Sequence, residues 1–423
     1  MKSHSLISTL KTLRGNARGC VFTEPLWGIP YNLYIPYVSI YMLTLGLNDK
    51  QIGLIASISW GFQVVMSLFS GVITDKLGRR RTTLVFDLIS WVVPSLLSAI
   101  AMNFWFFLIA GIINSVWRVT HNSWTCLLVE DADHEQLVDI YAWIYIAGLL
   151  VAFFSPLAGL LINKYDLVPT MRGLYFFAAF MFAFKATLTY FLTVETEQGK
   201  VRMQETKHQS VFAVLVEYKD VLRDLLRTPQ TLYTAALMLI LSAAGVVSGN
   251  FWAILVTEKL HVPAQNLAIF QFVRSITMLT FFFFITPRIR LWNFRLPMIG
   301  GFIGLIISIL VLIAAPAESY AAIILSVILE ACCYAFVSPQ IDRLTVLTVN
   351  AQERARIQSI LYVGVILLTS PFGWLAGVLS TENKILPFVL NSCLFAIGAV
   401  LAYFAGRYAE RHKAAPELVE GQA

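Results

Sequence analysis

The sequence predicts an all-α integral membrane protein with about twelve transmembrane helices, arranged as two pseudo-symmetric halves of six helices each. Of its 423 residues, 58% are hydrophobic and 13% are charged, whereas a soluble domain usually carries about 25% charged residues. Apolar runs long enough to cross a hydrocarbon core of about 30 Å recur along nearly the whole chain. In lipid, each backbone polar group needs a partner within its own segment, so these runs are expected to be helices.

The expected spans follow one another closely except near the middle of the chain. They cover residues 21–46, 51–74, 82–102, 104–129, 137–163, 172–194, 230–256, 264–286, 296–315, 319–342, 356–380 and 385–406. Prolines within them are expected to kink or interrupt the helices, namely Pro30, Pro36, Pro94, Pro156, Pro339 and Pro371. The resulting plan is an N-terminal segment (1–20), a first half (21–194), a central loop (195–229), a second half (230–406) and a tail (407–423).

The lysines and arginines predict the orientation in the membrane. Most of the 31 fall in segments that share one side with the N-terminus. The segments of the opposite side carry only Lys50, Lys164, Arg172, Lys259 and Lys384. By the positive-inside rule, both termini are cytoplasmic, and we expect a multi-pass protein of the plasma membrane. The net charge of +6 thus reflects topology, and we expect no nucleic-acid partner.

The central loop contains an amphipathic pattern. Its apolar residues share one helical face, opposite acidic and basic ones, which predicts a helix on the inner membrane surface or a simple linker between the halves. The apolar residues are Val211, Leu215, Tyr218, Leu222 and Leu225. The five cysteines lie within or at the edge of apolar segments, and we expect them to pack there without a disulfide or a metal.

The two halves have related sequences at corresponding places. Ser155-Pro156 in the fifth expected span recurs as Ser370-Pro371 in the eleventh, each with glycines shortly after. Internal duplication is a common plan for transporters, which place the substrate site near the membrane midplane where the halves meet.

A compact motif stands between the second and third expected spans and reads GVITDKLGRRR over residues 71–81. Its glycines permit a tight reversal and close helix approach, and its acidic and basic side chains can form charge-assisted hydrogen bonds. The residues concerned are Gly71, Asp75, Gly78, Arg79 and Arg80.

This motif resembles the signature of the major facilitator superfamily, and it stands in the cytoplasmic turn where that family has it. The resemblance implies that the cluster pairs with a carboxylate at the inner end of span 4 and with the start of span 11. Glu130 and Asp131 occupy the first of these places. A second pattern, the Gly-Pro-x-x-Gly-Gly of drug/proton antiporters, is only partly kept, because Ser155 and Leu160 replace its flanking glycines. That departure disfavours drug export without excluding it.

Polar residues within the spans are candidates for function, because a charge at mid-bilayer costs about 2.5–3.5 kcal/mol. In the superfamily, spans 1, 4, 7 and 10 line a central cavity. The residues expected to line the cavity here are Trp27, Tyr31, Asn32, Gln63, Asn114, Arg118, His121, Asn122, Asn250, Gln271, Arg274 and Glu330. Arg118 and Glu330 would face each other across it, either handling substrate and protons or forming a structural ion pair.

Three further charges fall within or near the ends of spans. For Glu24 and Asp87, an inner-leaflet salt bridge and a functional role are equally open, and Glu24 is the second candidate for proton coupling after Glu330. Lys185 lies on an outer helix of the superfamily fold, where we expect it to snorkel or pack.

Together these features predict a secondary active transporter that works by alternating access, coupled to protons, with sodium as an open alternative. Aromatic faces beside amide and charged groups favour a sugar-like cargo or another polar metabolite. A drug or lipophile efflux antiporter is the alternative, and a membrane receptor or sensor is the alternative from another class. We find no HExxH, GxSxG or Walker motif, and predict no enzyme activity, cofactor or metal. A small-molecule substrate and the bilayer are the expected partners of a monomer, and the direction of transport stays open.

Overall fold

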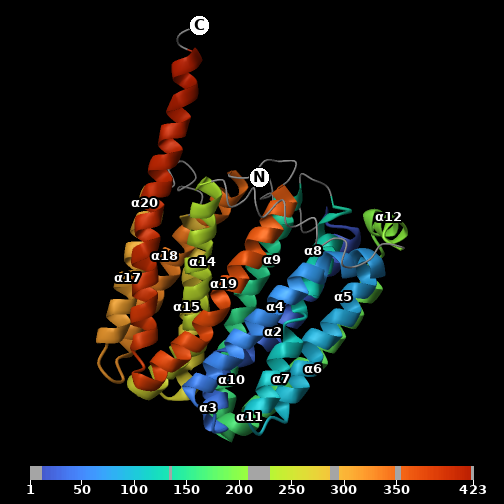
Figure 1. Cartoon of the computed structure of the whole chain (residues 1–423). Coiled ribbons are helices and arrows are strands. Elements are labelled where there is room, and N and C mark those ends of the chain that lie inside the picture. Colours follow the sequence, from blue (N-terminus) through green and yellow to red (C-terminus); the bar gives the residue numbers. More distant parts are fainter. Residues whose placement is uncertain (1–11, 133–135, 208–228, 286–294, 348–353, 421–423) are drawn as a thin grey trace, which may run out of the picture. The chain divides into compact units, whose positions relative to one another are not determined.

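The structure, a computed structural model, describes residues 12–132, 136–207, 229–285, 295–347 and 354–420. Throughout this part of the chain the elements are helices, with no strand (Figure 1). The predicted all-α fold is therefore confirmed. The chain divides into two compact units, of which the first comprises Met1–Leu215 with Pro263–Ser275, and the second Val216–Val262 with Ile276–Ala423.

The first unit is built from helices that are repeatedly broken and restarted. They are α2 (Gly15–Tyr34), η1 (Ile35–Tyr37), α3 (Val38–Thr44), α4 (Asp49–Leu77), α5 (Arg79–Asp87), η2 (Leu88–Val92), α6 (Val93–Ala99), α7 (Phe104–Asn114), α8 (Trp117–Val129), α9 (Leu137–Val151), η4 (Ala152–Phe154), α10 (Ser155–Tyr165), α11 (Leu167–Leu192), α12 (Glu197–Glu205) and η6 (Ala264–Asn266). Within this unit α11 packs against α2 and α6, and α8 packs against α4 and α5. These helices, together with α7 and the short elements η1, α3 and η2, line the site described below.

The second unit has longer uninterrupted helices. They are α14 (Pro229–Ile254), η5 (Leu255–Lys259), α17 (Arg295–Ala314), α18 (Tyr320–Leu347), α19 (Arg354–Glu382) and α20 (Leu386–Glu420), while α15 (Leu267–Phe284) contributes residues to both units. Helices α17 and α18 approach closely at Gly304. A Cβ at this position would lie only 2.3 Å from Cys333 Sγ, so the absence of a side chain permits the approach. The Ser308 and Ser326 side chains bridge the same helices, each donating to the other's backbone carbonyl at 3.0 and 2.9 Å.

Nine helices of the described residues are long and apolar enough to cross a membrane. The expected spans at 21–46, 104–129 and 264–286 are not among them. In the first, the 3-10 turn η1 separates α2 from α3, and in the second a turn at Ser115 and Val116 separates α7 from α8. A broken helix presents a shorter continuous apolar length, so the count of about twelve spans stays a prediction.

Prolines account for several of the breaks. Pro36 lies in η1, Pro94 opens α6 after the π-helical turn η2, and Pro156 opens α10 after η4. A proline lacks the N–H that would continue the helical bonding, so the preceding turn changes its pitch. By contrast, Pro30 and Pro371 stand inside continuous helices, α2 and α19.

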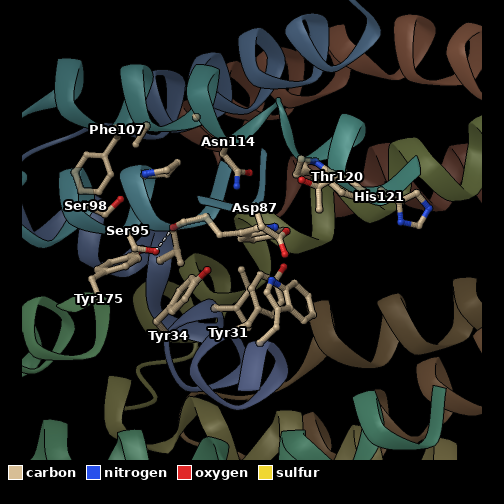
Figure 2. Close-up of a pocket in the computed structure, with 18 of the residues that line it drawn as sticks. Tyr31, Tyr34, Asp87, Ser95, Ser98, Phe107, Asn114, Thr120, His121 and Tyr175 are labelled. Carbon is tan, nitrogen blue, oxygen red and sulfur yellow. Dashed lines mark hydrogen bonds between the residues drawn. The ribbon is translucent and has the colours of Figure 1, made fainter. Parts of the chain in front are cut away.

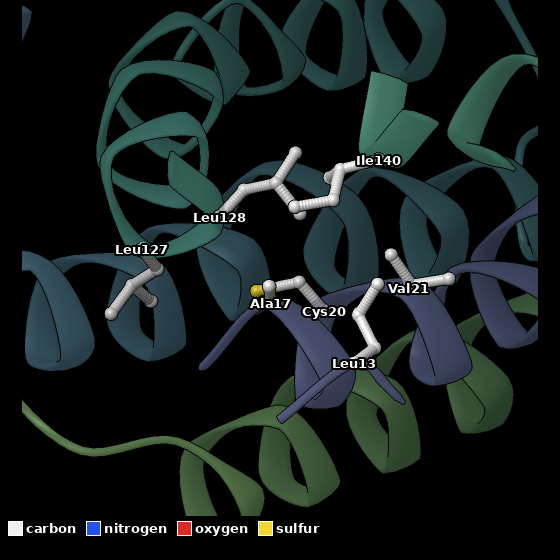
Figure 3. Close-up of a cluster of buried hydrophobic side chains, with 7 residues drawn as sticks. All are labelled: Leu13, Ala17, Cys20, Val21, Leu127, Leu128 and Ile140. Carbon is white, nitrogen blue, oxygen red and sulfur yellow. The ribbon is translucent and has the colours of Figure 1, made fainter. Parts of the chain in front are cut away.

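A cluster of buried apolar side chains fixes the start of α2 (Figure 3). Leu13, Ala17, Cys20 and Val21 pack against Leu127 and Leu128 of α8 and Ile140 of α9. All seven side chains are at most 6% exposed. The next residues of α2 enter the site described below, so this packing sets their direction. The amphipathic helix expected over residues 211–225 lies outside the described residues.

Candidate functional site

A cavity of about 500 Å³ lies within the first unit. Its size is typical of sites that enclose a small molecule. Its aromatic lining comprises Trp27, Tyr31, Tyr34, Trp91, Phe107, Trp117, Trp124 and Tyr175. Its polar and charged lining comprises Glu24, Gln63, Asp87, Ser95, Ser98, Asn114, Thr120, His121 and Lys185. Figure 2 shows Asp87 near the middle of the cavity, His121 toward one end, and Tyr175 toward the other.

Three ionisable groups gather in this cavity, and we call Glu24, Asp87 and Lys185 the charged cluster. Lys185 Nζ of α11 lies 2.8 Å from Asp87 Oδ2 of α5, and the two side chains are 6% and 3% exposed. Lys185 Nζ is also 5.9 Å from the centre of the Trp124 ring. Among the described residues, the Glu24 carboxylate forms no ion pair or hydrogen bond. The lysine therefore neutralises Asp87 directly and attracts the charge of Glu24 only at longer range.

Aromatic side chains of α2 continue from Glu24 along the same face, because the spacing to Trp27 and Tyr31 is three and then four residues. The rings of Trp27 and Tyr31 stack with centroids 4.7 Å apart. Trp91 meets both rings edge-on, at 5.1 and 6.0 Å. The result is a wall of aromatic faces and edges next to a carboxylate.

The π-helical turn η2 helps to place the groups contributed by the third expected span. It follows Asp87 directly and contains Trp91. Asn114 of α7 donates its side-chain N–H to the Ser90 carbonyl at 2.8 Å. Such π-turns leave carbonyls offset from the regular helical pattern and occur frequently at functional sites. Asn114 thus satisfies a carbonyl of the turn that presents Trp91.

Several buried polar atoms of the lining have no hydrogen-bond partner in the part of the chain that is described. They are Trp27 Nε1, Asp87 Oδ1, Thr120 Oγ1 and Trp124 Nε1. Buried polar groups are normally hydrogen-bonded, and an unmatched one costs about 1–3 kcal/mol. A bound solute with suitable polar groups would satisfy them.

The structure brings together part of the predicted cavity set. Trp27, Tyr31, Gln63, Asn114 and His121 line the cavity, as does Glu24. Three others make protein contacts instead and are not among the lining residues. Asn32 donates to the Gly28 carbonyl, Arg118 Nε donates to Gln63 Oε1 at 2.9 Å, and Asn122 donates to Thr74.

The remaining predicted residues belong to other parts of the chain. Gln271 and Arg274 lie in α15, on the portion grouped with the first unit, whereas Asn250 and Glu330 lie in the second unit. Asn250 donates to the Val246 carbonyl of its own helix at 2.7 Å. The predicted pairing of Arg118 with Glu330 would join two units, and it stays a prediction.

Sequence reasoning missed the ion pair between Asp87 and Lys185 as well as the roles of Trp91 and Trp124 in the lining. Of the two expectations for Lys185, snorkelling is wrong, because its ammonium is buried against a carboxylate. For Asp87 the salt-bridge alternative is the one observed. The signal was available, since two opposite charges within apolar segments of the same half are expected to find each other.

The motif at residues 71–81 forms a second charged network, at the turn between α4 and α5. Arg79 pairs with Asp75 at 2.9 Å and with Glu130 at 3.1 Å. Gly78 has a φ of +84°, a conformation that favours glycine. Asp131 accepts a hydrogen bond from Asn16 at 3.1 Å and does not join this network directly. Side chains at the start of the predicted eleventh span lie outside the described residues.

Residues of the predicted central loop complete this network. Glu195 accepts hydrogen bonds from the backbone N–H groups of Arg79 at 2.7 Å and Arg80 at 3.1 Å. It thereby caps the start of α5, where Gly78 has no side chain to do so. Arg202 of α12 lies 3.2 Å from Asp75, and this carboxylate raises the pKa of the Arg202 guanidinium above its usual value because the pair favours the charged form.

A Cβ at Gly71, in contrast, would meet no described atom within 4 Å. The close helix approach expected there is therefore not observed among the described residues.

Comparison with known families and proteins gives a consistent result. The family model described as Major Facilitator Superfamily matches residues 27–289. Among the curated relatives, an uncharacterized MFS-type transporter of Bacillus subtilis (strain 168), YqjV, is 25% identical over 131 residues, which are 30% of this chain and 32% of that protein. The multidrug resistance protein MdtG of Serratia proteamaculans (strain 568) is 27% identical over 213 residues, 48% of this chain and 49% of that protein. The matched stretches thus span about a third to a half of these relatives.

Solved structures extend the likeness over nearly the whole chain. The nucleoside transporter NupG has a TM-score of 0.70 and 15% identity, covering 93% of this chain and 98% of that one. A bacterial homolog to the human lysosomal transporter Spinster, in an inward-facing and unoccupied conformation, has a TM-score of 0.70 and 14% identity, covering 93% and 96%. At such identities the likeness shows the fold alone.

Proposed function

Because this chain belongs to the major facilitator superfamily and is a multi-pass membrane transporter of that type, we propose that it is a secondary active transporter of a small solute. The solute would pass by alternating access of the two predicted halves, with both termini in the cytoplasm and the protein in the plasma membrane. The observation that supports this most is the cavity of about 500 Å³ within the first unit, whose lining combines aromatic rings with charged and amide groups.

The lining favours a solute with a flat apolar face and several polar groups. Stacked Trp27 and Tyr31 offer surface for such a face. The unmatched N–H and O–H groups of Trp27, Thr120 and Trp124 are donors, so they suit acceptor atoms on the solute. A sugar-like metabolite meets these demands through its CH faces and hydroxyl oxygens. An aromatic or lipophilic drug meets the first demand more fully.

Drug efflux is the second candidate. It is favoured by the similarity of nearly half of this chain to a protein named for multidrug resistance. The incomplete Gly-Pro-x-x-Gly-Gly pattern around Pro156 argues against it.

For energy coupling we propose protons, and the cavity now favours Glu24 over Glu330 as the carrier. Glu24 lines the cavity and forms no ion pair among the described residues, so it is placed to alternate between charged and neutral forms. Burial disfavours the charged form of a carboxylate, whereas an approaching cation favours it. A conformational change that moves such a cation would load and release the proton.

Proteoliposomes with an imposed pH gradient test the proposal. We expect accumulation of solute that collapses when the gradient is dissipated. Glu24→Gln should lose gradient-driven accumulation but keep exchange of solute across the membrane without net movement when solute is saturating, because exchange needs no change in protonation. If Glu24→Gln accumulates solute normally and Glu330→Gln does not, the coupling role belongs to Glu330. Accumulation that persists in both variants and without any gradient would refute secondary transport driven by protons.

For the motif we propose a role in the balance between conformations, because its network lies at the α4–α5 turn and contributes no residue to the cavity lining. Asp75→Asn should slow transport, with solute affinity changed mainly through the populations of the two states. Loss of all solute binding in a well-folded Asp75→Asn protein would count against this role.

A further inference from the structure

We propose that Lys185 determines which charge the cavity accepts, and that the transported solute is an organic cation with a single positive charge and a flat aromatic part. This inference rests on the proposed transport function, because it assigns a solute class to the same cavity. It follows from the charges of the charged cluster and from their geometry.

The charged cluster has a net negative charge when its three members are ionised. Asp87 and Glu24 together carry two negative charges when ionised, and Lys185 supplies one positive charge. Lys185 Nζ lies 2.8 Å from Asp87 Oδ2, so these two charges cancel at short range. The cluster is left with one negative charge, that of Glu24. In a buried site such a charge is costly until a cation approaches it.

No other basic residue of the described lining supplies that counter-charge. His121 lines the cavity, but an ordinary histidine is neutral above pH 7. Arg118 is not among the lining residues, and it donates to Gln63 while its guanidinium carbon lies 4.3 Å from the centre of the Trp117 ring. Lys185 is already held by Asp87. Among the described residues, no lysine or arginine besides Lys185 lines the cavity, so the lining offers no second cation to Glu24 and a solute can supply it.

Aromatic side chains lie next to Glu24. Trp27 and Tyr31 follow it on the same face of α2, and Trp91 meets both rings edge-on. Aromatic faces attract cations and stack on flat rings, and the attraction is stronger for desolvated groups. A small hydrated metal ion gains little from such a wall. A flat organic cation matches both the charge and the rings, whereas a neutral sugar leaves the charge of Glu24 uncompensated.

The test uses probes that share one ring system and differ in charge: neutral phenanthridine, singly charged ethidium and doubly charged propidium. Binding to the purified full-length protein is measured at pH 8 by fluorescence, with phenanthridine read by competition. We expect wild-type protein to bind ethidium. Glu24→Gln removes the last negative charge, so ethidium binding should weaken by at least about tenfold while phenanthridine binding persists. Glu197→Gln, the same change at an 83% exposed side chain of α12, is the matched control and should behave as wild type.

The role of Lys185 is tested by two further variants. Lys185→Met leaves two negative charges, so the ratio of propidium to ethidium affinity should rise by about tenfold. The double variant Asp87→Asn/Lys185→Met restores a single negative charge, so its ethidium preference should return to that of wild type. The double variant contains no buried unpaired charge at this pair, so it tests the idea even if Lys185→Met does not fold. Because each probe is compared across variants, differences in probe size cancel.

Each result of these measurements supports or overturns the inference. Ethidium binding that is equal in wild type and Glu24→Gln overturns the inference, as does a double variant that folds but has lost ethidium. Wild-type protein that binds phenanthridine but not ethidium also overturns it, and leaves the cavity as the site of an uncharged solute. Absence of gradient-driven transport of any bound probe in liposomes would instead overturn the proposed function.

Discussion

Removing either member of the buried Asp87–Lys185 pair should destabilise the protein far more than removing both. In Lys185→Met, a carboxylate that is 3% exposed keeps its charge or must take up a proton. In Asp87→Asn, an ammonium that is 6% exposed loses its counter-ion. Breaking a buried pair on one side typically costs about 3–5 kcal/mol, whereas replacing both members is often close to neutral.

The double-mutant cycle gives the magnitude directly. If each single variant loses about 3–5 kcal/mol and the double variant is close to neutral, the coupling energy is several kcal/mol. It would be measured as the free energy of unfolding of the detergent-purified protein, from reversible unfolding in mixed micelles of increasing denaturing-detergent fraction. The same cycle at the exposed pair of α12, with Lys200→Met and Glu197→Gln, is the control, because surface pairs contribute about 0–1 kcal/mol to stability. If the losses of the two single variants simply add up in the double variant, the two side chains do not stabilise the fold as a pair.

Three further predictions concern other parts of the first unit. Glu195→Gln should destabilise the protein by about 1 kcal/mol, because it weakens the charged cap on the start of α5; thermal unfolding measures this, and an unchanged midpoint would contradict it. Gly159→Ala should impair folding or transport, because its Cβ would lie 2.2 Å from the Gln265 carbonyl oxygen, whereas the Cβ of Gly148→Ala would meet no described atom within 4 Å and should be tolerated; equal transport rates of the two variants would refute the close contact. Ethidium binding should weaken as the pH falls from 8 to 5, because protonation of Glu24 removes the charge that attracts the cation. In Glu24→Gln this pH dependence should shrink to the part contributed by His121, which also lines the cavity and gains a positive charge at low pH; a pH profile that is unchanged by the substitution would assign it to another group.

The helical class and most of the span positions were predictable because a lipid solvent demands long apolar segments with internal hydrogen bonding. The broken helices were harder to place. Proline predicted the interruptions at Pro36, Pro94 and Pro156, but equally suggested breaks at Pro30 and Pro371, where the helices continue. Local composition does not decide between a kink and a break, because the neighbouring helices supply the partners for the freed backbone groups.

The candidate site was predictable where its residues share one helix, and less so where they meet across helices. Trp27 and Tyr31 follow from the period of α2. The pairing of Asp87 with Lys185 joins residues 98 positions apart and depends on how α5 and α11 pack. Glu195 was missed for a similar reason, because its partners are backbone N–H groups, which carry no sequence signal.

The separation between Asp87 and Lys185 has a consequence for biosynthesis. At about 5–20 residues per second, the 98 positions between them take about 5–20 s to translate. During that interval the segment bearing Asp87 carries an isolated acidic group whose entry into lipid costs about 2.5–3.5 kcal/mol. We therefore expect this segment to stay beside the insertion machinery until α11 emerges and the two can leave together. Nascent chains truncated before residue 185 should remain cross-linkable to that machinery, and chains long enough for all of α11 to have left the ribosome should be released.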